Sequence, residues 1–188
     1  VLKDYLDGRA SKAYEPVDAD PDATYEETIR IDVSELEPLV VLPHKVAHNA
    51  TPANSLNETK IDQAFIGSCA NGRIEDFAVA AEILSGRQVA PGVRMIVTPG
   101  SQNVLQEAMA KGYVETLMNA GAVVTNSTCG ACYGGHMGVL GDGEVCITAS
   151  TRNFQGRMGS PEADIYLGSP ATVAASAIRG VITDPREV

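Results

Sequence analysis

The spacing of apolar residues changes near residue 60. Beyond it, short apolar runs alternate with segments whose apolar residues recur at the spacing of an amphipathic helix. Such alternation predicts an α/β fold with a mostly parallel sheet flanked by helices. The predicted strands are 61–66, 93–98, 122–125, 145–149 and 164–167, and the predicted helices are 74–84, 102–110, 114–120 and 170–178.

The part before residue 60 is more polar and less regular. Residues 1–9 predict the end of a helix, and residues 10–26 form a connector rich in Asp, Glu and Pro. Strands are predicted over 28–33, where apolar and polar residues alternate strictly, and over 38–42. We therefore expect residues 1–26 to be the tail of a preceding domain with its connector, and residues 27–188 to form one α/β domain.

Composition narrows the class of protein. The 188 residues are 44% hydrophobic, which is typical of a soluble globular protein. Because the sequence has no long apolar run and no signal-peptide pattern, we expect a cytoplasmic protein with no membrane partner. The net charge of −10 disfavours nucleic-acid binding. The chain starts with Val1 rather than Met, so we expect a processed product or a fragment.

Chemically distinctive residues follow directly after four predicted strands. Cys69 follows the first, the Pro99–Ser101 turn the second, Cys129 the third and Arg152 the fourth. Ligands of open parallel sheets bind beyond the carboxyl ends of the strands. We therefore expect these four segments to gather at one edge of the sheet and to form a single site.

The cysteines predict a metal centre at that edge. Cys129 and Cys132, with two residues between them, can clamp one centre, and Cys69 can supply a third thiolate. A structural zinc site needs four ligands, and an ordinary ferredoxin cluster uses four cysteines. Three thiolates favour a [4Fe–4S] cluster with one open iron, which acts as a Lewis acid. Cys146 lies mid-strand and is expected in the core, with a fourth-ligand role as the alternative; a zinc or redox module is the competing interpretation.

The arginines after the fourth strand predict an anion site. Arg152 and Arg157 flank Asn153, and guanidinium groups bind carboxylates in a bidentate way. Two of them beside an open iron suit a di- or tricarboxylate, whereas surface ion pairs are the alternative. Asn71 and Arg73, just after Cys69, support a cluster, or else Arg73 caps the following helix.

The histidines give no clear site. His44 and His48 stand four residues apart, but prolines on both sides predict a loop rather than a helical metal pair. His136 is expected to support the cysteine loop rather than to bind a metal. The sequence has no P-loop, no Gly-x-Gly-x-x-Gly after a strand and no readable Ser-His-Asp arrangement.

Taken in order, four segments resemble the aconitase superfamily, and most of all its 3-isopropylmalate dehydratase and homoaconitase branch. They are residues 67–73, 129–132, 143–146 and 152–157, within a match from about Lys60 to Pro185. The resemblance implies that Cys69, Cys129 and Cys132 ligate the cluster and that Arg152 and Arg157 contact substrate carboxylates. It also implies substrate-binding roles for Thr151 and Asn153, and a place around the cluster for Ser68, Asn71 and Arg73.

The resemblance implies an iron–sulfur hydro-lyase that isomerises a 2-hydroxy dicarboxylate, of the 3-isopropylmalate type, by dehydration and rehydration. Homocitrate- and dimethylmalate-type diacids are alternative substrates, and a non-catalytic iron–sulfur module is the alternative class. Two positions depart from the family pattern: Ala70 stands where Thr is common, and Thr151 where Asn is common. The acid–base residues are expected outside this chain, with the base on a small subunit, so we expect the isolated chain to be inactive.

Overall fold

The computed structural model describes residues 2–188, which divide into two compact units. The first unit ends at Leu36, whereas composition suggested a boundary at residue 26. It contains the short helix α1 (Leu2–Leu6), after which the Tyr14 hydroxyl donates to Asp7 Oδ1 over 3.1 Å. No helix of the described part is long and apolar enough to cross a bilayer.

The prediction of a strand over residues 28–33 is wrong. This segment has irregular backbone, and its apolar side chains, Ile29, Ile31 and Val33, are at least 70% exposed. An alternating pattern forms a strand only where a neighbouring strand pairs with it and buries the apolar side. Among residues 2–188 this segment has no such neighbour.

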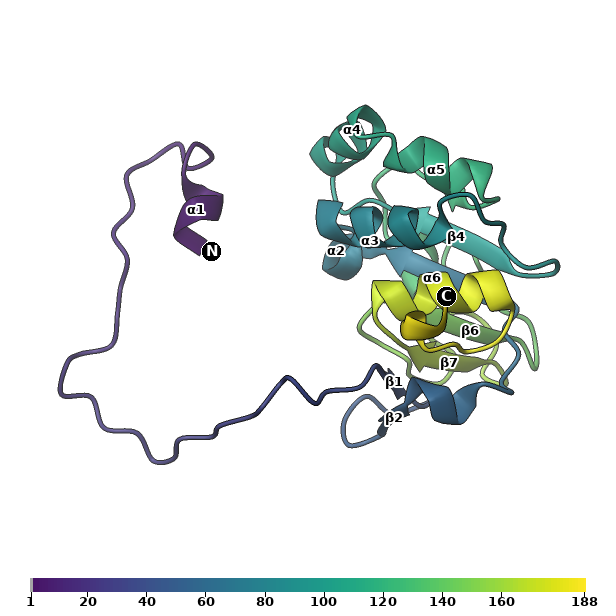
Figure 1. Ribbon diagram of the computed structural model, residues 1–188, viewed down its shortest axis with the longest axis horizontal. Coiled ribbons are helices and arrows are strands. Elements are labelled where there is room, and N and C mark those ends of the chain that lie inside the picture. The colour runs from purple at the N-terminus through teal and green to yellow at the C-terminus, as the bar shows by residue number, and fades with distance from the viewer. Residues whose placement is uncertain (1) are drawn as a thin grey trace. The chain divides into compact units, whose positions relative to one another are not determined.

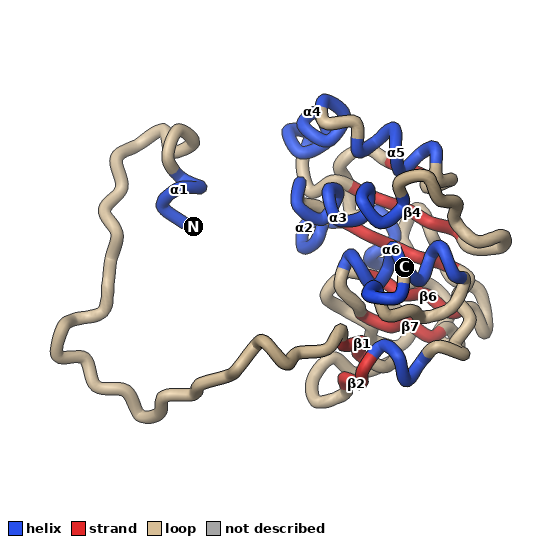
Figure 2. The backbone as a smooth tube through the Cα atoms, in the orientation of Figure 1, coloured by secondary structure: helices blue, strands red, loops and turns tan. Residues whose placement is uncertain are grey.

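The second unit, Glu37–Val188, is built on one seven-stranded sheet of order β2-β1-β7-β6-β3-β4-β5 (Figures 1 and 2). Strands β3 to β7 are parallel, and β1 pairs antiparallel with β2 and β7. This confirms the predicted α/β class. The strands are β1 (Leu39–Val41), β2 (Ala50–Pro52), β3 (Gln63–Gly67), β4 (Arg94–Thr98), β5 (Val123–Val124), β6 (Val145–Thr148) and β7 (Asp164–Leu167).

Helices cover one face of this sheet. Ser101 caps α4 and Ser169 caps α6, because each side chain accepts a hydrogen bond from the first-turn backbone. Four helices lie near their predicted positions, while β2 and the short helices were not predicted. The helices are α2 (Ser68–Asn71), α3 (Ile74–Leu84), α4 (Gln102–Ala110), α5 (Tyr113–Asn119), α6 (Pro170–Arg179) and the 3₁₀ turns η1 (Ala53–Leu56), η2 (Gly130–Tyr133) and η3 (Pro185–Glu187).

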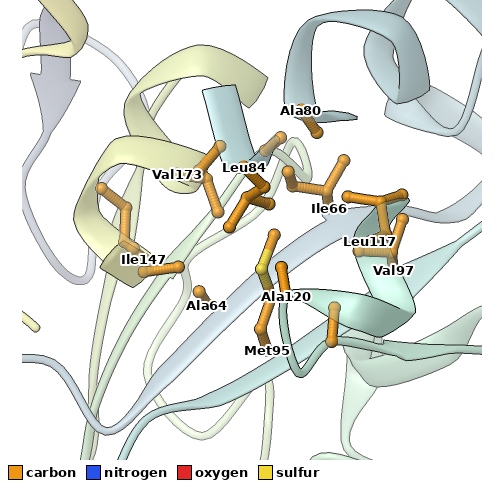
Figure 3. Packing of buried hydrophobic residues seen from close by; sticks show 14 of the residues in the cluster. Ala64, Ile66, Ala80, Leu84, Met95, Val97, Leu117, Ala120, Ile147 and Val173 are labelled. Carbon is orange, nitrogen blue, oxygen red and sulfur yellow. The ribbon is translucent and has the colours of Figure 1, made fainter. Parts of the chain in front are cut away.

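Alternate residues of each central strand enter two different cores. Ala64 and Ile66 of β3 pack with Leu84 and other residues of the helical side (Figure 3). Phe65, between them, packs instead with Ala131 and Cys132. The second face is therefore covered by loops rather than by helices, and these loops carry the cysteine pair and the arginine run. This arrangement ties the candidate site to a buried core.

Candidate functional site

Cys69 stands at the carboxyl end of β3, on α2. A sharp turn places it there: Gly67 has φ +129° and Ser68 has φ +69°, which is unusual for a residue with a side chain. The Cys69 side chain is exposed. Ser68 is buried, and its Oγ has no hydrogen-bond partner among the described residues. An unpaired buried hydroxyl beside a strained turn is typical of a functional site.

Cys132 lies on the turn η2, which follows β5, and Cys129 is the residue that precedes this turn. Cys132 N donates to Cys129 O over 3.1 Å, so the two residues belong to one tight turn. The Thr128 hydroxyl accepts from Gly130 N over 2.7 Å and lies 3.2 Å from His136 Nε2, which closes the loop. The expectation that His136 supports the cysteine loop agrees with this contact. Cys129 is exposed, and Cys132 is 8% exposed.

The two cysteine-bearing elements are neighbours. Helix α2 packs against η2, and η2 packs against β4. Gly130 leaves no room for a side chain, because a Cβ there would lie 2.6 Å from Thr98 Oγ1 and 2.9 Å from Phe65. Gly100 N donates to Gly72 O over 2.7 Å, which joins the turns after β3 and β4. The strand ends thus gather at one edge, as the sequence predicted.

The sulfurs do not form a ready-made metal group. Within residues 2–188, no three His, Cys, Asp or Glu side chains lie close enough together to hold a metal ion. All four cysteines are free thiols. The structure therefore brings the cysteine-bearing segments together without converging their sulfurs.

Cys146 lies apart from this edge, within β6. It is fully buried, and burial raises the pKa of its thiol to about 12, although the hydrogen bond from Gln63 opposes this shift. Its Sγ lies 3.7 Å from Gln63 Nε2. A thiol that resists ionisation is a poor metal ligand. Its expected place in the core is confirmed.

The arginine run divides into two different environments. Arg152 is exposed, and its Nη1 donates to Thr151 Oγ1 over 3.1 Å. Arg157 is half-buried and reaches back to the cysteine turn: its Nε donates to Cys132 O over 2.9 Å, and its Nη2 lies 3.7 Å from Cys132 Sγ. Asn153 is fully buried, and its Nδ2 donates to Leu42 O over 2.6 Å. One run thus contacts both the cysteine turn and the loop after β1.

Asn71 and Arg73 lie at this edge, whereas His44 lies beside the first residue of β7, away from it. Asn71 ends α2, and Arg73 N donates to Asp76 Oδ2 over 2.9 Å at the start of α3. The backbone of Arg73 therefore occupies the helix-cap position. His44 Nε2 lies 3.3 Å from Asp164 Oδ1, and both His44 and His48 adopt positive φ in a loop.

Ser150 was missed by the sequence reasoning. It is 5% exposed at the end of β6, and its Oγ has no partner within the part of the chain described. Parallel pairing of β3 with β6 puts the segment after Thr148 beside the segment after Phe65. Ser68 and Ser150 therefore bring two unpaired hydroxyls to neighbouring strand ends. Nothing in the spacing of residues distinguishes Ser150 from an ordinary turn serine.

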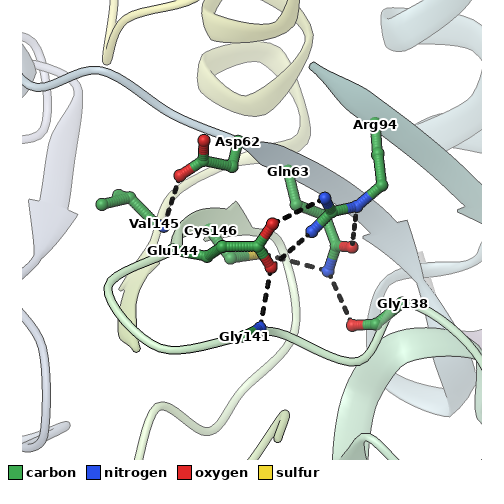
Figure 4. Close-up of polar contacts among 8 residues, drawn as sticks. All are labelled: Asp62, Gln63, Arg94, Gly138, Gly141, Glu144, Val145 and Cys146. Carbon is green, nitrogen blue, oxygen red and sulfur yellow. Dashed lines mark hydrogen bonds and ion pairs between the residues drawn. The ribbon is translucent and has the colours of Figure 1, made fainter. Parts of the chain in front are cut away.

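A polar network fastens the far end of the cysteine loop (Figure 4). Buried Gln63 donates from Nε2 to Gly138 O over 3.0 Å and accepts from Arg94 Nε. Arg94 binds Glu144 through two bonds of 2.7 and 2.8 Å, and Gly141 N donates to Glu144 Oε2. The network thus links the beginnings of β3, β4 and β6 to residues 138–141, in the loop that runs from the cysteine turn to β6. The sequence signal for this network was Gln63, a polar residue within the predicted strand 61–66.

This network predicts a pH dependence of stability. Arg94, followed by Gly141 N–H, lowers the pKa of Glu144 below its ordinary value of 4.5. A lowered pKa gives stabilisation that is complete above the unfolded-state value and is lost as the pH falls through the folded-state value. We expect Glu144→Gln to lower the free energy of unfolding at pH 7 by about 1 kcal/mol, since the pair is partly exposed.

Urea unfolding between pH 7 and about pH 3 would measure this effect. The difference between the original chain and Glu144→Gln should vanish at the acidic end. Glu162→Gln is the control, since Glu162 is exposed and forms no ion pair within residues 2–188. A difference that persists unchanged at low pH would contradict the assignment.

The family model of the aconitase family (aconitate hydratase) matches residues 43–180, which include every cysteine and the arginine run. The chain belongs to the aconitase family. Membership of the aconitase family implies an iron–sulfur cluster. It also accounts for a sheet edge at which cysteines from separate strand ends meet an arginine run.

Aconitase-family relatives match along almost the whole chain. The 3-isopropylmalate dehydratase large subunit of Mycolicibacterium smegmatis is 59% identical over 188 residues, which is 100% of this chain and 44% of that protein. The proteins of the same name from Wolinella succinogenes (48% over 191 residues, 100% and 45%) and Methanopyrus kandleri (large subunit 1, 51% over 183 residues, 97% and 44%) are similar. The chain thus spans less than half the length of these curated relatives.

The residues present fit an iron–sulfur cluster in their chemistry. Cys69, Cys129 and Cys132 are thiols with no disulfide partner, and they stand on packed neighbouring elements. Thiolates are the usual ligands of such clusters. The unpaired hydroxyls of Ser68 and Ser150 are hydrogen-bond donors without another use in the described structure.

Proposed function

We propose that this chain is the cluster-binding part of the large subunit of a hydro-lyase that isomerises 3-isopropylmalate to 2-isopropylmalate by dehydration and rehydration. The observation that carries the proposal is the 59% identity, over all 188 residues, to a 3-isopropylmalate dehydratase large subunit. Because the chain has a net charge of −10, a dianion needs local positive charge to bind, and the arginines at this edge supply it.

We assign Cys69, Cys129 and Cys132 as the ligands of a [4Fe–4S] cluster with one iron that lacks a cysteine. When bound, such a cluster supplies a Lewis acid for the hydroxyl group and a carboxylate of the substrate. The packing of α2 against η2 supports the choice of these cysteines. The buried, weakly acidic thiol of Cys146 supports leaving it out.

We assign Arg152, with its neighbours Thr151 and Asn153, to the substrate. Arg157 has Nη1 left for a carboxylate, because its Nε and Nη2 contact Cys132. Arg152 is exposed, and among residues 2–188 its side chain has a hydrogen bond only to Thr151, so its guanidinium can turn toward a carboxylate. Asn153 anchors the run through Leu42 O, and its Oδ1, unpaired among residues 2–188, remains for a ligand. We assign Ser68, Asn71 and Arg73, which flank Cys69 in the chain, to the surroundings of the cluster.

The groups that transfer protons are proposed to lie outside this chain. The chain spans about 44% of the relatives named large subunit, so we propose a small subunit as partner and acid–base residues outside this chain. The four free thiols suit a reducing compartment, which favours the cytoplasm.

Anaerobic loading of the chain with iron and sulfide tests this function. The EPR spectrum of the reduced cluster should change when 3-isopropylmalate is added, because an iron without a cysteine can accept the substrate. The same amount of 2-hydroxy-4-methylpentanoate, which lacks the second carboxylate, should change it much less. The loaded chain alone should show no turnover. A spectrum that ignores the diacid, or turnover without a partner, would contradict the proposal.

A further inference from the structure

Arg157 joins the arginine run to the cysteine turn. Its Nε donates to Cys132 O over 2.9 Å, and its Nη2 lies 3.7 Å from Cys132 Sγ. Both nitrogens belong to one rigid, planar guanidinium, so together they fix the backbone and the sulfur of the same cysteine. Of the three proposed ligands, Cys132 alone has a guanidinium against its sulfur within the described residues.

The backbone on which Arg157 stands is itself fixed to the cysteine loop. Leu140 N donates to Met158 O over 2.8 Å, and Ser160 N donates to Leu140 O over 2.9 Å. On the other side, Gly134 touches Met158 so closely that a Cβ would lie 2.5 Å from the Met158 carbonyl carbon. Met158, the residue after Arg157, is thus held by Leu140 on one side and by Gly134 on the other. The backbone that carries the Arg157 side chain is therefore fixed.

The two arginines of the run therefore differ in what they hold. The Arg152 side chain is exposed, and among residues 2–188 its hydrogen bond is to Thr151. Two of the three guanidinium nitrogens of Arg157 contact Cys132, which leaves Nη1 for any other ligand. A residue whose only task was to bind a substrate carboxylate would keep both ends of its fork for that carboxylate.

We propose that Arg157 is a positioning residue for the cluster: it holds Cys132 in place and donates a charge-assisted hydrogen bond to its thiolate. This rests on the proposed function, in which Cys132 is a ligand. Hydrogen bonds to the sulfurs are one of the factors that set the potential of an iron–sulfur cluster. A cationic donor stabilises the more negative, reduced state and so raises the potential.

The test compares three variants of the chain, each loaded anaerobically with iron and sulfide. Arg157→Gln removes the charge, Arg157→Lys keeps the charge but not the fork, and Arg87→Gln is the control, since Arg87 is exposed and donates to Ile83 O on the helical side of the sheet. We expect Arg157→Gln to hold iron against a ferrous chelator about 10- to 100-fold less well, the usual cost of losing a group that orients a ligand. Its midpoint potential, followed by EPR, should fall. Arg157→Lys should lower the potential less than Arg157→Gln does, and Arg87→Gln should match the original chain.

The outcomes separate this inference from the function on which it rests. If the original chain takes up a cluster and Arg157→Gln equals it in retention and potential, the positioning role is wrong while the cluster assignment stands. If the original chain takes up no cluster, the proposed function is wrong, and the role of Arg157 with it. Circular dichroism checks folding; should Arg157→Gln fail to fold, an unchanged potential in Arg157→Lys overturns the role.

Discussion

We expect the Cys132→Ala chain to assemble no stable [4Fe–4S] cluster, whereas the Cys146→Ala chain assembles one as the original chain does. Cys132 lies on η2, against α2 and under the Arg157 guanidinium. Cys146 lies inside β6, where burial raises its pKa to about 12. Loss of one thiolate from a set of three leaves too few ligands, while a core thiol contributes none.

Both changes remove a buried sulfur, so the pair controls for the effect of burial. Cys132 is 8% exposed and Cys146 is fully buried. Each substitution should cost about 1 kcal/mol of stability through the lost packing. Iron and sulfide content per chain after gel filtration, together with visible absorption, gives the readout. A cluster in Cys132→Ala, or its loss in a folded Cys146→Ala, would refute the ligand assignment.

We expect Gly67→Ala to be the most damaging single substitution at the strand ends. A Cβ on Gly67 would lie 2.0 Å from Thr98 O and 2.8 Å from the Thr98 carbonyl carbon and nitrogen. These atoms belong to the neighbouring strand β4, paired in register with β3, so neither can move alone. The change should lower the free energy of unfolding by about 3 kcal/mol or more, combining overpacking with an unfavourable positive φ.

Gly86→Ala is the matched control for this change. Gly86 also has a positive φ, of +70°, but a Cβ there meets nothing within 4 Å. It should cost only the conformational term, about 1–2 kcal/mol. Urea unfolding at pH 7 measures both. Equal losses for the two variants would mean that the close approach of β3 and β4 is not what requires glycine at residue 67.

Strong periodicity made much of the fold predictable. The ranges of α3, α4 and β7 agree with those predicted, because each has a clear apolar spacing and a defined end. The meeting of the turns after β3, β4 and β5 at one edge followed from strand–helix alternation alone. The prediction for 28–33 failed because alternation describes one side of a strand and cannot supply the strand that pairs with it.

The contacts within the site were beyond the sequence. Arg157 reaches Cys132 across 25 positions, and this depends on how two loops cross the same face of the sheet. The sequence predicted Asn153 as a substrate contact but could not show that its Nδ2 binds Leu42 O, because this depends on how the run folds over the loop after β1. The role of Ser150 needed burial to be known, since an unpaired hydroxyl is visible only in three dimensions.

The pairing of β3 with β6 bears on the order of events as the protein matures. Gln63 and Cys146 are paired neighbours although 83 positions separate them. Closing so long a loop lowers the entropy of the chain before any stabilising contact forms, so the rate of such pairing is low. Arg157 follows β6, so its contact with Cys132 forms only once this pairing has placed the chain after β6 on the sheet. The guanidinium that holds the proposed ligand Cys132 is therefore put in place late in folding, after the cysteine turn itself.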